Sequence, residues 1–447
     1  MGAARFGRKA ASFAGDHSRD IQSACYRTIM QDRKEVVIIG AGVVGLCTAF
    51  YCARRGLKVT VLDRAPRQRD GCSFGNAGMI VPSHFIPLAA PGMITLGLKW
   101  MLNPESPFYI QPRLNAGLMK WGLAFCRAAT ASRVNHAAPV LRDFSLLSRQ
   151  CYEQLPLDLG LVKKGLLMLC KESHTLEEEA QTAKKAEELG IPAQVLNASE
   201  TAALDPDVTM DVIGSVFFPM DCHLSPARLM QMLEDELDRA GVERLYDCSV
   251  EHWHSQPHGQ GSKITALETT QGRLQADEFV VAAGIWSEGL TKRLRLNLPM
   301  QAGKGYSLTL SKPRQLPQLC SICTEARLAV TPMDGFLRVG GTMELAGVDT
   351  SVNHRRVRGI VRSFPQYFPE FKESDFEGIE PWSGLRPVPP DGLPYLGRTS
   401  HWSNLILATG HAMMGLSLAP GTGKTVADII TGEKPAVDLT LFSPDRF

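Results

Sequence analysis

The chain has 447 residues, of which 44% are hydrophobic and 21% are charged. This composition is typical of a folded globular protein and excludes a disordered, collagen-like or low-complexity chain. The 48 Lys and Arg against 46 Asp and Glu leave a formal charge of +2, which gives no electrostatic reason to expect a nucleic acid as partner.

Residues 1–34 differ from the rest of the chain. They are rich in basic residues and contain no apolar run long enough for a secretory signal. We interpret them as a disordered extension or as sequence upstream of a working start at Met30, with a transit peptide as the alternative. No transmembrane helix is predicted, because the longest run without acidic or basic residues, 71–98, is interrupted by prolines.

The eleven cysteines are scattered along the chain, which favours a reducing compartment over a disulfide framework. Cys320 and Cys323 form the only tight pair. No second pair follows that would supply the further ligands of a zinc ion. We therefore expect loop and core thiols here and predict no metal site.

A nucleotide-binding pattern begins at residue 35. An apolar run over 35–39 predicts a buried parallel strand, and helical spacing follows as far as Gly56. A second strand is predicted over 58–63. Strand, glycine turn, helix and strand in this order are typical of the unit that binds dinucleotides.

Three glycines and one acid carry the chemistry of this unit. Gly40 permits a tight turn, Gly42 lets the backbone approach a pyrophosphate, and Gly45 allows the helix to pack closely on the strand. The helix N-terminus presents N–H groups to the phosphates. Asp63 can accept hydrogen bonds from the adenosine ribose. The pair Asp63–Arg64 argues weakly against NADP, although an arginine can also accommodate a 2′-phosphate. The pattern alone does not separate nicotinamide from flavin.

Two further segments precede residue 131. The uncharged, small-residue segment 71–79 predicts a loop buried against a planar ligand, with Ser73 and Asn76 as hydrogen-bonding groups. Residues 85–130 are apolar and broken by Pro and Gly. They fit a substrate entrance, a membrane-surface segment or plain core packing.

The remaining elements are predicted from periodicity and stop signals. Helices are expected over 140–155, 176–189 and from Ser225 to Gly241, and strands over 246–252, 263–269 and 273–283 with a turn at 257–262. The segments 299–310 and 329–342 predict an antiparallel sheet. Gly421 to Thr425 resembles a phosphate-binding loop, but Leu418 stands where that motif needs glycine. We expect a strand, a glycine turn and a helix there instead.

Seven short segments, in the same order along the chain, resemble the flavin amine oxidoreductases of the D-amino acid oxidase and glycine oxidase superfamily. The likeness is greatest to the small subunits of bacterial D-amino acid dehydrogenases and extends over 35–434. The segments are 40–45 with Asp63 and Arg64, 73–78, 89–92, 281–287, 303–307, 384–387 with 391–392, and 409–411 with 418–420.

The resemblance implies an α/β fold that binds FAD in extended form. A Rossmann-type, glutathione reductase-like FAD-binding domain is expected to interleave with an α+β substrate domain built on an antiparallel sheet. The FAD-binding domain would comprise 35–84, 222–290 and 379–434, the substrate domain 85–221 and 291–378, and the tail 435–447.

The resemblance also assigns residues to parts of the cofactor. The ADP half would lie against Ile39, Gly40, Ala41, Gly42, Val43, Val44, Gly45, Asp63, Arg64 and Val250. The flavin would lie along Ser73, Asn76, Ala77, Gly78 and Met79, with Ala283, Gly284 and Trp286 closing the pocket and Gly410, His411, Met414, Gly415 and Leu416 at the pyrimidine end of the ring.

Arg386 matches the family arginine that binds the substrate carboxylate, a task suited to a planar guanidinium. Tyr306 is a weaker candidate for the catalytic site. Met413 and Met414 stand where glycine oxidase-like members have an arginine, which implies a roomier apolar pocket for the substrate side chain.

The implied activity is oxidative deamination of a D-amino acid, or of a cyclic imino acid such as D-hydroxyproline, by hydride transfer from Cα to flavin N5. No general base is required if the amine binds neutral. A quinone or an electron-transfer protein would take the electrons. The expected location is the cytoplasm, with a peripheral contact on the inner face of a membrane left open. The alternatives are an amine or 2-hydroxy acid oxidoreductase and a flavoprotein subunit of a heteromeric dehydrogenase.

Overall fold

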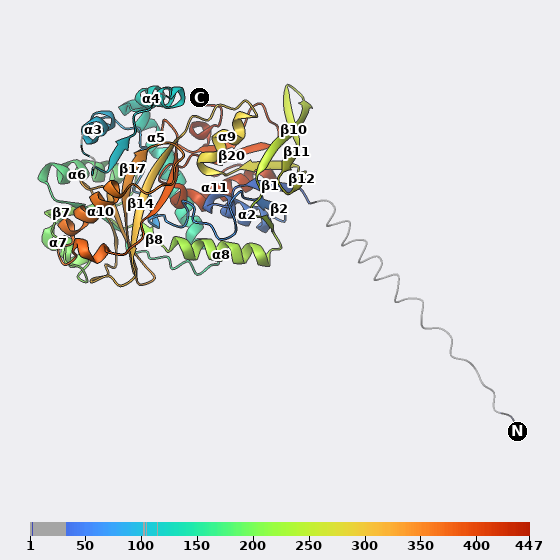
Figure 1. Cartoon of the computed structure of the whole chain (residues 1–447). Coiled ribbons are helices and arrows are strands. Elements are labelled where there is room, and N and C mark those ends of the chain that lie inside the picture. The colour runs from blue at the N-terminus through green and yellow to red at the C-terminus, as the bar shows by residue number, and fades with distance from the viewer. Residues whose placement is uncertain (1, 3–32, 102, 104, 114) are drawn as a thin grey trace.

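Two large sheets lie side by side in the computed structural model, which describes residues 2, 33–101, 103, 105–113 and 115–447 (Figure 1). Apart from Gly2, Arg33 and Lys34, the predicted extension 1–34 lies outside the described residues. A six-stranded sheet contains the nucleotide-binding pattern, and a nine-stranded sheet contains Arg386. The α/β architecture predicted from the sequence is confirmed.

The six-stranded sheet is assembled from three separated parts of the chain. In sheet order its strands are β19 (Tyr395–Arg398), β20 (Leu405–Thr409), β13 (Glu278–Val281), β1 (Glu35–Ile39), β2 (Lys58–Leu62) and β9 (Glu243–Leu245). All neighbours are parallel except the edge pair β19–β20. Both faces of the central strands are covered, which explains their continuous apolar sequences.

Helices cover one face of this sheet and a small sheet covers the other. The helices are α2 (Val43–Arg54), α5 (Ala131–Gln154), α8 (Pro226–Arg239) and α11 (Gly415–Thr431). The small sheet comprises β10 (Val250–His258), β11 (Gly261–Thr269) and β12 (Gly272–Leu274), next to η1 (Gly284–Trp286) and α9 (Ser287–Lys292).

The hairpin of β10 and β11 corrects one expectation. The first strand runs to His258 rather than ending at His252, and the turn holds only Gly259 and Gln260. Gly259 has a φ of +59°, which suits a two-residue hairpin turn. The end of β10 is polar and exposed on both faces, so hydrophobic alternation could not mark it.

The nine-stranded sheet is mixed and separates two cores. Its path is β18 (Trp382–Val388), β14 (Gln301–Leu310), β17 (Phe336–Leu345), β16 (Leu328–Met333), β15 (Cys320–Cys323), β5 (Leu166–Cys170), β7 (Gly214–Phe218) and β6 (Gln194–Asn197), with β4 (Phe108–Ile110) beside β17. Its outer face packs under α10 (His354–Tyr367). The predicted antiparallel pairing of 299–310 with 329–342 is confirmed as β14 with β17, although 329–342 also includes most of β16 and forms a hairpin.

The remaining elements connect the sheets or cover their ends. They are β3 (Met79–Ile80), α3 (Met93–Trp100), α4 (Ala116–Ala128), α6 (Ser173–Glu188), α7 (Ala198–Leu204), β8 (Cys222–His223), η2 (Glu373–Phe376) and η3 (Thr440–Phe442). Arg446, in the predicted tail, donates to the Asp391 carboxylate at 2.7 Å, so the end of the chain is attached to the core.

Two motifs singled out in the sequence belong to regular secondary structure. Cys320 and Cys323 are both buried on β15, but their thiols lie in two different cores. The segment Gly421 to Thr425 lies inside α11 and is not a loop. The rejection of a phosphate-binding loop there is confirmed.

Candidate active site

A cavity of about 1080 Å³ lies between the two sheets. Its lining begins at the carboxyl ends of β1, β2, β13 and β20. It then crosses the inner face of the nine-stranded sheet and reaches α3 and α4. The carboxyl edge of a parallel sheet is the usual place for a ligand in open α/β proteins.

The glycine turn after β1 separates structural from ligand-facing positions. Gly40 has a φ of +112°, and a Cβ there would lie 2.5 Å from the Ala282 carbonyl oxygen. A Cβ on Gly45 would overlap the Gly40 carbonyl oxygen. A Cβ on Gly42 meets only Ser73 Oγ, at 3.5 Å, and Gly42 lines the cavity. The fold therefore requires Gly40 and Gly45, whereas Gly42 keeps the cavity side of the turn open.

Two helices begin at the cavity. The first backbone N–H of α2, from Val43, donates to Ser73 Oγ at 2.9 Å. The helix α11 follows the turn at Gly410, where φ is +74°. Neither helix has an acidic residue in its first turn, and no described residue at the N-cap position of either forms a side-chain cap. These N-termini therefore favour anionic parts of a ligand.

Asp63 lies at the end of β2 with both carboxylate oxygens engaged. It accepts from the Ala41 N–H at 2.7 Å and from the Ala65 N–H at 2.8 Å. Each carboxylate oxygen has a further lone pair, and Asp63 lines the cavity, so it can also accept from ligand hydroxyls. Nearby, the guanidinium of Arg64 stacks 4.0 Å from the Trp286 ring. Arg64, Trp286 and Val250 all line the cavity.

The loop between β2 and β3 is held by the nine-stranded sheet. Arg338 Nη1 donates to the carbonyl oxygens of Phe74 and Asn76, both at 2.8 Å. Ser307 Oγ donates to the Gly75 carbonyl at 3.2 Å. Burial lowers the pKa of Arg338, which stays a cationic donor. The sequence analysis missed Arg338, since nothing in its local pattern links it to a loop about 260 residues away.

Arg69 is a second residue that the sequence analysis missed. Its Nη2 donates to the Ala41 carbonyl at 2.7 Å and to Glu234 at 2.6 Å. Both charged side chains are largely buried. Arg69 thereby connects the glycine turn to α8. Its only signal in the sequence was the basic turn after β2.

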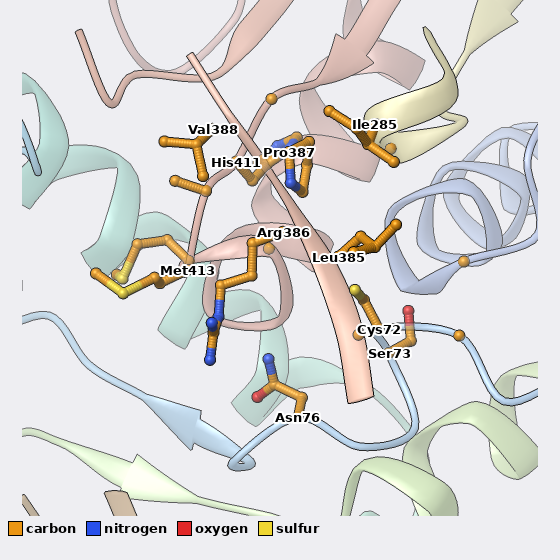
Figure 2. Close-up of a pocket in the computed structure, with 18 of the residues that line it drawn as sticks. Cys72, Ser73, Asn76, Ile285, Leu385, Arg386, Pro387, Val388, His411 and Met413 are labelled. Atoms are coloured by element: carbon orange, nitrogen blue, oxygen red, sulfur yellow. The ribbon is translucent and has the colours of Figure 1, made fainter. Parts of the chain in front are cut away.

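Arg386 projects from β18 into the cavity, in the direction of Asn76 (Figure 2). Its one hydrogen bond within the described chain goes from Nη1 to the Thr342 carbonyl, at 2.8 Å. No described carboxylate pairs with it, and burial lowers its pKa. Gly305 makes room for the guanidinium, because a Cβ at that position would overlap it. The guanidinium is thus placed to bind an anionic ligand group.

The Tyr306 side chain packs in the core under α10 rather than toward Arg386. Its hydroxyl donates to Glu344 Oε2 at 2.7 Å and accepts from the Asn353 N–H at 3.3 Å. Burial and Glu344 raise the pKa of Tyr306, so the phenol stays protonated. The hydroxyl cannot meet a substrate while Glu344 holds it. A catalytic role for Tyr306 stays a prediction.

The segment between β20 and α11 completes the wall. His411 Nε2 lies 2.9 Å from Thr422 Oγ1, and burial lowers the pKa of His411 to about 4, so the ring is neutral. The Met413 side chain is 47% exposed and lines the cavity with Met414. The two methionines leave this wall apolar, as expected from the sequence.

Most of the predicted site residues come together in this cavity. Those that line it are Ile39, Gly40, Gly42, Val43, Val44, Asp63, Arg64, Ser73, Asn76, Ala77, Met79, Val250, Ala283, Gly284, Trp286, Tyr306, Arg386, Gly410, His411, Met414, Gly415 and Leu416. Ala41, Gly45 and Gly78 do not line it. Ala41 bonds Asp63, Gly45 packs on Gly40, and a Cβ on Gly78 would overlap the Leu224 carbonyl oxygen.

The cavity suits an extended dinucleotide. Helix N-termini without acidic residues in the first turn can donate N–H groups to a pyrophosphate. The Asp63 carboxylate can accept hydrogen bonds from ribose hydroxyls. The wall beyond them is apolar and ends at Arg386, which has no carboxylate partner among the described residues. This geometry fits a dinucleotide-binding protein whose second ligand is an anion.

Comparisons with known proteins agree with this class. The family described as FAD dependent oxidoreductase (DAO) matches residues 35–429, and the chain belongs to this family. FAD is therefore its cofactor. A D-amino acid dehydrogenase of Bradyrhizobium diazoefficiens is 30% identical over 426 residues, which is 92% of this chain and 99% of that protein.

Two further relatives show the same extent of similarity. A D-amino acid dehydrogenase of Vibrio cholerae serotype O1 is 33% identical over 421 residues, covering 91% of this chain and 97% of the relative. The crystal structure of glycine oxidase from Geobacillus kaustophilus superposes with a TM-score of 0.71 at 25% identity, covering 93% of this chain and 99% of that one. The prediction of a flavoenzyme that oxidises an amino acid is confirmed.

Proposed function

We propose that the chain oxidises D-amino acids, or cyclic imino acids of the same configuration, and that Arg386 binds their carboxylate. The observation that carries this proposal is the half-buried guanidinium of Arg386, which faces the cavity without a described carboxylate partner. A desolvated charge is costly unless it is paired, so a carboxylate ligand complements it. The relatives named D-amino acid dehydrogenases support the configuration of the substrate.

The chain contributes mainly positioning to the reaction. Arg386 would hold the substrate carboxylate through charge-assisted hydrogen bonds, and Thr342 fixes one side of the guanidinium. The apolar wall around Met413 and Met414 would exclude water and favour a neutral amine. When bound, FAD supplies the group that accepts hydride from Cα. Orientation then accounts for much of the rate enhancement.

Anaerobic flavin reduction tests this proposal. Pure protein with bound FAD is mixed with D-alanine, D-methionine, D-proline and 4-hydroxy-D-proline, and with their L-forms, while the flavin absorbance is recorded. We expect bleaching by at least one D-form and not by its L-form. Retention of the flavin colour with every D-compound would refute the substrate class. Bleaching by an amine or a 2-hydroxy acid alone would favour the alternative donors.

We further propose that the electrons pass to a quinone at a membrane surface rather than to an electron-transfer protein. The cavity reaches the surface at Ile94 of α3 and Cys126 of α4, which are exposed and line it. Ile94, Met119 and Leu123 on these helices are 40%, 69% and 55% exposed. Such an apolar opening suits a hydrophobic acceptor.

Charges around this opening fit an anionic lipid surface. Lys99, Lys120 and Arg127 are exposed on the same two helices. In the described part of the chain, no helix combines the length and the apolar character needed to cross a membrane.

Flotation with vesicles tests the membrane contact. We expect the protein to float with phosphatidylglycerol vesicles and to be released by high salt, and Met119→Glu to abolish flotation without changing dye-coupled turnover. A matched exposed residue away from α3 and α4, Val195→Glu, should float like the parent protein. Absence of flotation together with poor reduction of a soluble quinone would refute this proposal.

A further inference from the structure

The loop after β3 brings a histidine to the cavity at some distance from Arg386. His84 is half-buried, lines the cavity, and its backbone N–H donates to the Val81 carbonyl at 3.0 Å. Val81 and Phe85, on either side of it, pack in the same core as Met168, Ile322 and Ala329 of the nine-stranded sheet. Neither the proposed function nor the sequence analysis uses this side chain.

A hydrogen-bonded chain behind His84 fixes its ring. Ser83 donates to both oxygens of the buried Asp221, from its backbone N–H at 3.1 Å and from Oγ at 2.5 Å. Ser83 Oγ also lies 3.0 Å from His84 Nδ1. The Asp221 carbonyl in turn accepts from the Gly165 N–H at 3.1 Å, which anchors the acid to the backbone beside β5.

The order of donors and acceptors in this series of hydrogen bonds assigns the tautomer of His84. An ionised Asp221 has no proton, so the single hydroxyl proton of Ser83 points to it. The Ser83 oxygen must then accept, and His84 Nδ1 must carry the ring proton. The other nitrogen, Nε2, keeps its lone pair and has no hydrogen-bond partner among the described residues. A neutral acceptor is therefore the polar group that His84 offers.

Burial and one neighbouring charge keep His84 neutral. Burial and the nearby Arg327 lower its pKa to about 4. Burial raises the pKa of Asp221 to about 7, although the Ser83 hydrogen bonds and the charge of Arg149 oppose that shift. Above pH 8 the acid is thus ionised and the histidine uncharged, as the tautomer assignment requires.

The same neighbours restrict what His84 could bind. Arg327 lies at the cavity, where its guanidinium is 5.9 Å from the Trp100 ring, and its charge disfavours a cationic ligand group. A lone pair does not bind an anion. The remaining ligand chemistry is a neutral hydrogen-bond donor, which is a hydroxyl or an amide N–H.

The inner face of the nine-stranded sheet carries several small residues near the cavity. Gly305 on β14, Gly340 on β17 and Ala329 on β16 lie on three adjacent strands. Gly305 lies under the guanidinium, and two strand spacings separate it from β16, about 10 Å. A substrate held at its carboxylate by Arg386 would extend its side chain over this face.

We propose that His84 is a specificity residue, which accepts a hydrogen bond from a hydroxyl or amide N–H on the side chain of the substrate. This inference rests on the proposed function, since it takes Arg386 as the carboxylate site. Ser83 and Asp221 are positioning residues that fix the ring and its tautomer.

The test compares substrates that differ in one hydroxyl group. Dye-coupled kcat/KM is measured at pH 8.5 for D-threonine with D-valine, D-serine with D-alanine, and 4-hydroxy-D-proline with D-proline. We expect the unmodified protein to favour the hydroxylated member of at least one pair by about tenfold. His84→Phe should abolish that preference while kcat/KM for the apolar member stays within about threefold.

A second variant separates specificity from folding. Ser83→Ala leaves the ring in place but removes the acceptor for Nδ1–H, so the preference should fall part of the way with an unchanged flavin spectrum. His174→Phe, an exposed histidine on α6, serves as the matched control and should change nothing.

An equal rate for both members of every pair in the unmodified protein would overturn the inference. So would a preference that survives His84→Phe or, if that variant does not bind FAD, one that survives Ser83→Ala unreduced. Failure of the proposed function is distinguishable, because then neither member of any pair would bleach the flavin.

Discussion

The two sheets contribute to the cavity in different ways. The six-stranded sheet contributes mainly backbone groups, which belong to a glycine turn and to the N-termini of α2 and α11. Each of these features lies within one short segment of the chain. The nine-stranded sheet offers side chains, of which Arg386 and Arg338 come from strands separated by β14. A site made of backbone groups tolerates few substitutions and stays committed to one cofactor. A site made of side chains can change its ligand through single substitutions.

Paired glycine substitutions give the largest expected effect and test the backbone half of this comparison. Gly45→Ala forces its Cβ onto the Gly40 carbonyl oxygen, so the turn cannot form, and we expect loss of FAD and of folded protein. Gly42→Ala meets only Ser73 Oγ at 3.5 Å, so the apoprotein should fold normally but bind FAD at least tenfold more weakly. Circular dichroism and flavin fluorescence measure the two effects.

The opposite outcome for this pair would be informative. If Gly42→Ala retained full FAD affinity, the cofactor would not approach the backbone at this turn. The backbone half of the comparison would then be wrong.

Arg386 tests the side-chain half. Arg386→Ala removes the cationic partner of the substrate carboxylate, and we expect KM to rise by a factor corresponding to about 2–4 kcal/mol, with FAD still bound. Arg386→Lys keeps the charge but loses the planar fork, so it should recover only part of the loss. Steady-state kinetics with a dye acceptor measures both variants, and an unchanged KM in Arg386→Ala would contradict the assignment.

Arg338 sharpens the comparison, because it reaches from the side-chain sheet to the backbone of the cofactor loop. Arg338→Met removes the donor to the Phe74 and Asn76 carbonyls, and we expect the Kd for FAD to rise about tenfold. Arg314→Met, which breaks an exposed pair with Asp375, should leave the Kd unchanged. Equal Kd values for both variants, measured by fluorescence titration, would mean that the loop does not depend on the sheet.

The same contrast explains what the sequence could predict. Gly40, Gly42, Gly45 and Asp63 lie within one strand–helix–strand unit, so their spacing alone predicts a nucleotide site. The partners of Arg338 and the Ser83–Asp221 bond join residues far apart in the chain, and no local pattern encodes such pairings. Arg386 was found only through resemblance to a family.

Two limits of periodicity appear as well. The exposed end of β10 lacks a hydrophobic face, so its true end at His258 was missed. Arg69 lies in an irregular segment, where its bonds to Ala41 and Glu234 have no periodic signal. In both cases the local sequence carries no hydrophobic period, which is the signal on which the prediction of secondary structure rests.

The smallest expected effect is the pH dependence of stability that His411, in the cavity wall between β20 and α11, contributes. The folded pKa of His411 is about 4, below its ordinary value of 6.5, so only the unfolded chain takes up a proton between those values. Its contribution to stability is therefore present above pH 6.5 and lost as the pH falls toward 4. His84 and His223 act in the same direction, whereas Asp221, with a raised pKa, acts in the opposite one.

A variant isolates the His411 part of this balance. Between pH 7.5 and 5.5, His411→Gln should lose about 1 kcal/mol less free energy of unfolding than the parent protein. Urea unfolding of the FAD-bound proteins at both pH values provides the measurement. Identical losses in the two proteins would show that His411 is not buried and neutral in the folded state.

The most direct test of the central claim pairs the substrate carboxylate with Arg386. Anaerobic rates of flavin reduction are compared for D-proline and D-prolinamide, and for D-alanine and D-alaninamide, in the parent protein and in Arg386→Ala. We expect the parent protein to prefer the acid over the amide by about 30-fold or more, and the variant to lose that preference. An acid-to-amide ratio that is the same in both proteins would contradict the account.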